Sequence, residues 1–334
     1  MSIIRYTFFS HDNLKIRIND FNEYLQNYSN QQGYVWIDLF DPIFEDLIIL
    51  RNHFNLHHLS IDDCMDENQL PKCEDFSNYT FVIFNNFYYK NNNLSIEEIN
   101  IFLGKNYIIT IHGRNYPEYD FFDKFYDTSV SVSKEIFRGP DFLMQYYLDY
   151  IVDNKFLALE EIQDLTDSIE GSIIDTSDKF DPRKIMDIRS DLLKLHKSLF
   201  HEREILIKLC RKDSPFISEG SIYYYRDIYD HLAKFFEFIE MNREMITSLM
   251  ELYLSMININ MNKISNQTNT VMKRLTLITT IFMPLNLIAG ILGMSEFSMM
   301  FGPDNWKLSY PVLFLFMCCL GYLNYIFLKW KKWV

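Results

Sequence analysis

The stretch LTLITTIFMPLNLIAGILG, residues 275–293, contains 19 residues without a charge. A second uncharged run of 19 residues, YPVLFLFMCCLGYLNYIFL, occupies residues 310–328. An α-helix rises about 1.5 Å per residue, so each run would extend about 28 Å, close to the roughly 30 Å hydrocarbon core of a bilayer. Two such runs near the C-terminus, each with basic residues on one side, predict two membrane-spanning helices rather than buried helices of a soluble protein.

The basic residues that flank the two runs predict how the hairpin is oriented. They are Lys273 and Arg274 before the first run, and Lys329, Lys331 and Lys332 after the second. Because positive flanks stay in the cytoplasm, both termini would be cytoplasmic, with an external loop at 294–309 and a basic cytosolic tail at 329–334. Aromatic residues suited to the membrane interfaces flank the spans: Trp306, Tyr310, Trp330 and Trp333.

The remainder of the chain is acidic. The 334 residues carry a net charge of −13; residues from Val271 onward hold six basic and two acidic side chains, a net of +4, which leaves −17 for residues 1–270. This charge argues against a nucleic-acid partner, because phosphate binding needs a basic surface. The five cysteines show no metal-ligand spacing and are expected to be reduced and buried. No signal peptide is predicted at the N-terminus.

Residues 1–130 are predicted to form a cytosolic α/β domain. β-branched and aromatic residues are concentrated in YVWIDLF (34–40), TFVIFNNFYY (80–89), EINIFL (98–103) and YIITIH (107–112). The last two runs are joined by Gly104-Lys105-Asn106, which is typical of a hairpin turn.

Long helices are predicted after this domain. Residues 131–220 would form a helical hairpin, with one helix at about 141–174 and a second that begins at Asp181-Pro182 and ends near Arg211. A stalk helix would occupy residues 221–293, starting near Tyr223 and continuing into the first span. Its expected packing seam repeats every three or four residues: Phe235, Ile239, Asn242, Ile246, Leu249, Tyr253 and Met256.

Polar and small residues share one face of the first span. They recur every three or four residues: Asn269, Met272, Thr276, Thr279, Met283, Asn286, Gly290 and Gly293. Intramembrane polar groups tend to face a bundle interior or water. The stripe could therefore line a pore or serve as a small-residue seam for tight helix packing. Since one hairpin cannot enclose a pore, the first reading requires several copies of the chain.

Four segments closely resemble the CorA family of divalent-cation transporters. VMKRLTLITTIFMPLNLIAGILGM (271–294), followed by the second span and KWKKWV (329–334), is similar to that family's membrane hairpin. LHHLSIDDCMDENQLPKCEDFSNYTFVIF (56–84), INIFLGKNYIITIHG (99–113) and YYRDIYDHLAKF (224–235) resemble its cytosolic part. The resemblance covers nearly the whole chain. It implies an α+β membrane protein in which the α/β domain and stalk helices form a cytosolic funnel above two transmembrane helices.

The resemblance also implies a function and a set of sites. The chain would be a homopentamer in the bacterial inner membrane that moves Mg²⁺, with Co²⁺ and Ni²⁺ as further candidate ions, passively, without catalysis or an organic cofactor. The implied pore-lining residues are Asn269, Met272, Leu275, Thr276, Thr279, Met283, Asn286 and Gly290. Residues Gly293, Met294, Ser295 and Glu296 would form the entrance. Asp62, Asp63 and Asp227 would bind a regulatory divalent cation between neighbouring subunits.

One departure leaves the transported ion open. The family's outer signature is Gly-Met-Asn, and Ser295 replaces its asparagine here. A ring of short hydroxyl groups reaches less far toward a hydrated Mg²⁺ than a ring of amides, although Glu296 would draw cations to the entrance. Two alternatives therefore stand beside Mg²⁺ transport: a CorA-like Zn²⁺ transporter, and a membrane metal sensor or scaffold that does not conduct.

Overall fold

The computed structural model describes residues 3–29, 31–66, 69–90, 93–113, 125, 134–176, 180–211, 214–293 and 306–331. The chain divides into two compact units, Met1–Leu252 and Tyr253–Val334. The predicted fold class is confirmed, with an N-terminal α/β part, a very long helix and a C-terminal helix. The finer domain ranges given above stay predictions.

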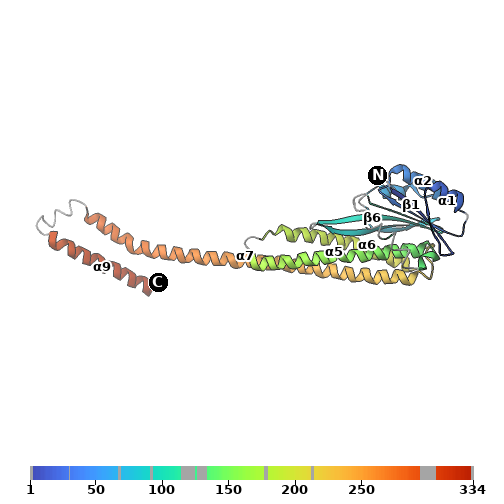
Figure 1. Ribbon diagram of the computed structural model, residues 1–334. Helices are drawn as coiled ribbons and strands as arrows, with labels where there is room; N and C mark the ends of the chain where they lie inside the picture. Colours follow the sequence, from blue (N-terminus) through green and yellow to red (C-terminus); the bar gives the residue numbers. More distant parts are fainter. Residues whose placement is uncertain are drawn as a thin grey trace. The chain divides into compact units, whose positions relative to one another are not determined.

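A seven-stranded mixed sheet forms the centre of the first unit (Figure 1). The strand order is β2-β1-β3-β7-β6-β5-β4; β3 and β7 pair in parallel and the other neighbours are antiparallel. The strands are β1 Ile3–Ser10, β2 Lys15–Ile18, β3 Gly33–Phe40, β4 Lys72–Asp75, β5 Tyr79–Lys90, β6 Asn93–Gly104 and β7 Tyr107–His112. The four predicted strands and the hairpin at residues 104–106 are confirmed, whereas β1, β2 and β4 were not predicted.

The two faces of the sheet are covered by different helices. Helices α1 (Phe21–Asn27) and α2 (Phe44–Phe54) lie on one face and α5 (Pro140–Thr176) lies on the other (Figure 1). Side chains alternate along β3 accordingly, since successive residues of a strand point to opposite faces. Val35 and Ile37 join the apolar core with α2 and α3 (His58–Met65). Trp36 points the other way and contacts Phe125 edge-on.

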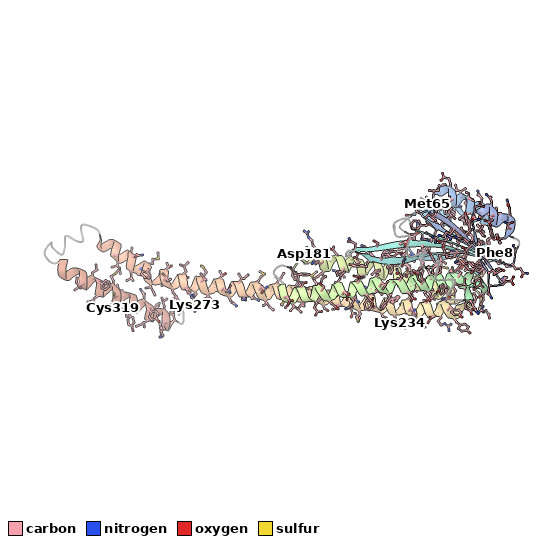
Figure 2. The ribbon with its side chains drawn as sticks, viewed as in Figure 1. Phe8, Met65, Asp181, Lys234, Lys273 and Cys319 are labelled. Atoms are coloured by element: carbon pink, nitrogen blue, oxygen red, sulfur yellow. The ribbon has the colours of Figure 1, made fainter. Side chains whose placement is uncertain are left out.

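Helix α6 (Arg183–Cys210) runs beside α5 and begins where the sequence predicts. The Asp181 carboxylate accepts a hydrogen bond of 3.0 Å from the backbone N–H of Arg183, and Pro182 precedes the first helical residue. Figure 2 labels Asp181 at this end of the helix. An aspartate that accepts from a free N–H in the first turn, next to a proline that has no N–H to satisfy, fixes the start of a helix.

A buried ion pair ties α5 and α6 to the sheet. Lys155 on α5 donates to Glu202 on α6, and both side chains are shielded from solvent. Glu202 also accepts from the backbone N–H of Asn85 on β5 at 3.1 Å, and from Ser198 at 3.2 Å. The Lys155 ammonium lies 4.4 Å from the ring centroids of both Phe84 and Phe87. Two helices and a strand are thus joined through one set of charge-assisted hydrogen bonds.

Helix α7 (Ile222–Leu292) is 71 residues long, and it continues through Pro284. The predicted seam is confirmed in its first half, where Ile239, Asn242, Ile246 and Leu249 are buried. Burial fades at Tyr253 and Met256, which are only partly covered. The seam therefore provides packing within the first unit and stops near the boundary between the units.

In the second unit, the end of α7 packs against α9 (Trp306–Trp330). A methyl group added at Gly321 of α9 would lie 3.6 Å from Leu285 Cδ1 of α7, so Gly321 permits a close approach of the two helices. Figure 2 labels Lys273 on α7 and Cys319 on α9. All five cysteines are thiols, as predicted, and Cys64 is buried. Cys73 and Cys210 are only partly buried, and the prediction of burial is wrong for Cys318 and Cys319, which lie exposed on an apolar helix.

Candidate ion pathway and regulatory carboxylates

The polar stripe on α7 is exposed along its whole described length. Asn269, Thr276, Thr279, Asn286 and Gly290 are all open to solvent in the single chain. The apolar members of the set are exposed too: Met272, Leu275 and Met283, the last of them 70% exposed. A buried packing seam within the chain is therefore not what these residues form.

The stripe faces away from α9. The partly covered residues of this segment are Leu277, Ile281, Leu285 and Ile288, and Leu285 is the one that approaches Gly321. At roughly 100° per residue, this covered face lies about half a turn around α7 from the stripe. The second helix of the hairpin thus contacts the apolar side of α7 and leaves the amide and hydroxyl side uncovered.

The threonines of the stripe are satisfied by their own helix. Thr276 donates to the Met272 carbonyl at 2.8 Å and Thr279 donates to the Leu275 carbonyl at 2.9 Å. This back-bonding satisfies the hydroxyl hydrogen and leaves the oxygen lone pairs exposed. Each threonine therefore presents an acceptor, which suits contact with water or a hydrated cation.

Gly293 is described at the end of α7, where its N–H donates to the Ala289 carbonyl at 2.9 Å. The other three predicted entrance residues, Met294, Ser295 and Glu296, lie outside the described residues.

The predicted regulatory residues Asp62 and Asp63 lie on α3. Asp62 is exposed. Asp63 forms an ion pair with Lys72 on β4, with 2.7 Å between Lys72 Nζ and Asp63 Oδ2. Lys72 also lies 3.3 Å from a Glu74 carboxylate oxygen. Nearby, burial and the charges of Asp66 and Asp63 raise the pKa of Glu98 to about 7. Asp63 therefore belongs to an acidic group that already contains one fixed ammonium.

Asp227, the third predicted regulatory residue, lies exposed on α7 beside a second group of ligands. Asp149 and Asp153 of α5 and His231 of α7 each offer a ligand atom, and these three atoms lie within 4.8 Å of one another. Partial burial and the charge of Asp153 raise the pKa of Asp149 to about 6, and Asp227 contributes in the same direction. Oxygen and imidazole donors this close together could hold a divalent cation.

Comparisons with known proteins agree on one family. The family model of the "CorA-like Mg2+ transporter protein" matches residues 31–330. The cobalt/magnesium transport protein CorA of Thermotoga maritima is 33% identical over 286 residues, which are 84% of this chain and 78% of that protein. The putative metal ion transporter YfjQ of Bacillus subtilis is 30% identical over 302 residues, 90% of each chain. This chain belongs to the CorA family.

A solved structure supports the fold of this CorA-family chain. The complete CorA magnesium transporter of Methanocaldococcus jannaschii superimposes with a TM-score of 0.73 at 22% identity and covers 99% of both chains. The described residues include two helices long and apolar enough to cross a membrane, α7 near its end and Pro311–Trp330 of α9. The membrane hairpin predicted from residues 275–293 and 310–328 matches these two helices.

Asp149, Asp153 and His231 of this CorA-family chain were not predicted from the sequence. A signal was present, because Asp149 and Asp153 are four residues apart, as are Asp227 and His231, and such pairs share one face of a helix. Lys72 was not predicted either, because its pairing with Asp63 depends on how α3 lies beside β4.

Proposed function

We propose that this chain forms a homopentamer that conducts divalent cations, Mg²⁺ foremost, passively across the bacterial inner membrane. The observation that carries the proposal is the uncovered stripe of Asn269, Thr276, Thr279 and Asn286 on the side of α7 opposite α9. Exposed amides are costly against lipid, so this side requires a wet surface or further copies of the chain. Five α7 helices around an axis meet both requirements, with α9 outside them and both termini cytoplasmic.

Each side chain of the stripe has a distinct role in this proposal. Asn286 and Thr279 present oxygen acceptors to the water shell of the ion, because Mg²⁺ sheds its water reluctantly. Met272, Leu275 and Met283 form apolar rings that close the pore by excluding water when they are narrow. Asn269 lies at the cytosolic end of the pore, and Gly290, which has no side chain, leaves the pore wide at its level. Gly293, Met294, Ser295 and Glu296 form the entrance.

Regulation would use the acidic groups of the first unit. Asp62 and Asp63 of one subunit would face Asp227 of the next, and Asp149, Asp153 and His231 would complete the ligand set. A bound divalent cation supplies positive charge beyond that of Lys72, the ammonium that pairs with Asp63. Without the cation, the excess negative charge around Asp63 and Asp227 is repulsive across the subunit boundary, the stalk helices separate, and the rings at Met272 and Leu275 widen.

The free energy available is sufficient for gating. When the free cation concentration is 100 times the Kd, each site contributes about 2.7 kcal/mol of stabilisation. Five sites therefore contribute roughly 13 kcal/mol if all favour the closed state. Moving a two-state equilibrium from 1:99 to 99:1 requires only about 5.5 kcal/mol.

The proposal is tested by divalent-cation uptake into proteoliposomes under an inward potential. Asn286→Leu replaces five amides of the pore wall with apolar groups and is expected to reduce Mg²⁺ uptake by about tenfold or more. Asn324→Leu is the matched control, because Asn324 lies on α9 and has no proposed contact with the ion. Equal loss in both variants would contradict a pore lined by α7. Native mass spectrometry of the solubilised chain tests the subunit number, and a dimer would contradict the pentamer.

Two alternatives have their own readouts in the same assay. Competition among Mg²⁺, Zn²⁺, Co²⁺ and Ni²⁺ distinguishes a Zn²⁺ transporter, which the serine at position 295 would favour if it weakens the Mg²⁺ entrance site. Absence of any flux in the unmodified protein would support the sensor or scaffold.

A further inference from the structure

The Asp63 carboxylate forms an ion pair with an ammonium group of its own chain, that of Lys72. Lys72 is the first residue of β4, an edge strand of the sheet, and Asp63 lies in the last turn of α3. Lys72 Nζ lies 2.7 Å from Asp63 Oδ2, and the two side chains are 30% and 19% exposed. The pair is therefore partly shielded, and the oxygen that it occupies is one that a regulatory cation would need.

A second carboxylate, that of Glu74, also lies within ion-pair distance of the Lys72 ammonium. Glu74 Oε1 is 3.3 Å from Lys72 Nζ, and its side chain is 45% exposed. Partial burial alone would lower the pKa of Lys72, but its hydrogen bonds to Asp63 and Glu74 outweigh that effect and raise the pKa. Lys72 thus stays charged, and it can lose Asp63 as a partner without being left unpaired.

We propose that Lys72 is a built-in competitor for the regulatory site, held on Asp63 when divalent cation is scarce and displaced onto Glu74 when the site fills. This inference rests on the regulatory role proposed above for Asp63. It makes Lys72 the residue that sets the Mg²⁺ concentration at which the channel closes.

The competitor also gives the site a preference for ionic charge. A monovalent ion that displaces Lys72 from Asp63 replaces one positive charge with another and gains little. A divalent cation adds a charge to a group that also contains Glu74, Asp66 and Glu98, so only a divalent cation gains enough to displace the ammonium. Lys72 therefore keeps the site insensitive to the monovalent ions that dominate the cytosol.

The test uses the full-length protein in detergent micelles and follows its melting temperature as Mg²⁺ is added. A ligand that binds only the folded state raises that temperature with concentration. A fit of the rise gives the Mg²⁺ concentration at which the site is half occupied, called the midpoint below, which reports the apparent affinity without measuring flux. Lys72→Met is expected to lower the midpoint by about three- to tenfold, since both the competitor and its repulsive charge are removed. Glu74→Gln is expected to raise the midpoint, because the displaced ammonium loses its second partner.

Two controls separate competition from a general change of charge. Lys208→Met makes the same change in net charge at a lysine of similar exposure, 32%, which pairs with Asp75 instead of Asp63. Its midpoint is expected to stay within about twofold of the unmodified protein. Lys72→Arg keeps the charge and can hold the carboxylate through two hydrogen bonds, so its midpoint is expected to stay the same or rise. Melting temperatures without Mg²⁺ show that each variant is folded.

The outcomes distinguish this inference from the proposed function. A Lys72→Met midpoint equal to that of the unmodified protein, or a shift matched by Lys208→Met, overturns the role of Lys72 and leaves cation regulation intact. If Mg²⁺ does not stabilise the unmodified protein, or if Asp63→Asn leaves its midpoint unchanged, regulation through Asp63 is wrong and the role of Lys72 fails with it. Transport through the α7 stripe, which is measured separately by uptake, would stand in either case.

Discussion

The two halves of α7 belong to one helix but differ in what covers them. In the first half, Ile239, Asn242, Ile246 and Leu249 are buried within the first unit. From Tyr253 to Ile291, no residue that the structure describes is buried. A helix in a protein gains most of its stability from packing, so the second half, which α9 covers on one side only, must obtain its other partners from lipid or from other copies of the chain. The first half is covered by its own chain, and the second half leaves one side uncovered.

The largest expected effect concerns the stability of the first unit, to which the first half of α7 belongs. Lys155→Met removes the partner of the buried Glu202 and leaves an uncompensated charge between α5, α6 and β5. The free energy of unfolding is expected to fall by about 3–5 kcal/mol. The measurement is urea unfolding of the full chain in detergent, followed by near-ultraviolet circular dichroism.

The controls for this prediction come from the same helices. Lys194→Met breaks a pair with Asp191 on α6 in which the lysine side chain is 55% exposed, so water can replace the ammonium, and stability is expected to change by less than about 1 kcal/mol. The double substitution Lys155→Met/Glu202→Leu removes both buried charges and should recover most of the lost stability. If the double variant is as unstable as Lys155→Met, shape and packing explain the loss better than charge does.

The sequence predicts the parts of this fold that are governed by local pattern. Uncharged runs of 19 residues, the Asp181-Pro182 helix start and the apolar run 34–40 each carry their own signal, and each matches an observed element. Strand β4, KCED, could not be predicted, because it is short and polar and exists only through its pairing with β5. Strand β1 was missed although it is long, and its place beside β3 depends on contacts far along the chain.

The candidate sites divide in the same way. The stripe from Asn269 to Gly290 follows from helical periodicity alone, and the structure adds that α9 covers the opposite face. The cluster of Asp149, Asp153 and His231 depends on how α5 lies against α7, and the Lys72–Asp63 pair depends on how α3 lies beside β4. Contacts between elements are what a single sequence lacks, so residue spacing indicated each side chain but not its partner.

A second prediction concerns charge, which also separates the two halves of α7. The second half has no acidic residue between Glu251 and Glu296, whereas the first half presents Asp227 and His231 beside Asp149 and Asp153. Burial first, and then the charge of Asp153, raise the pKa of Asp149 to about 6 from an ordinary value of 3.8. Any dependence of the Mg²⁺ response on pH between 5 and 7 should therefore arise in the first unit, from Asp149 beside the first half of α7 and from Glu98, whose pKa is raised to about 7.

The sign follows from competition between protons and the cation. Below about pH 6 Asp149 is protonated and unavailable as a ligand, so the apparent affinity for Mg²⁺ should fall by roughly tenfold between pH 7 and pH 5. Without Mg²⁺ the same shift means that ionisation of Asp149 costs stability as pH rises from about 4 to 6, so Asp149→Asn should stabilise the cation-free protein at pH 7. Melting curves at several pH values measure both effects. Glu160→Gln, an exposed change on the same helix, should alter neither.

The smallest expected effect compares two asparagines on one helix. Asn242 is buried in the first half; its amide N–H₂ donates to the Phe238 carbonyl at 3.0 Å, and its carbonyl oxygen has no hydrogen-bond partner among the described residues. Asn286 is exposed in the second half. Asn242→Leu is expected to raise the free energy of unfolding by about 1 kcal/mol and to leave Mg²⁺ uptake unchanged, because a buried unsatisfied carbonyl is removed. Asn286→Leu is expected to reduce Mg²⁺ uptake and to leave the free energy of unfolding unchanged. If Asn242→Leu instead destabilises the protein or changes the subunit number, its carbonyl is bound by another copy, and the first half of α7 depends on the assembly as much as the second half does.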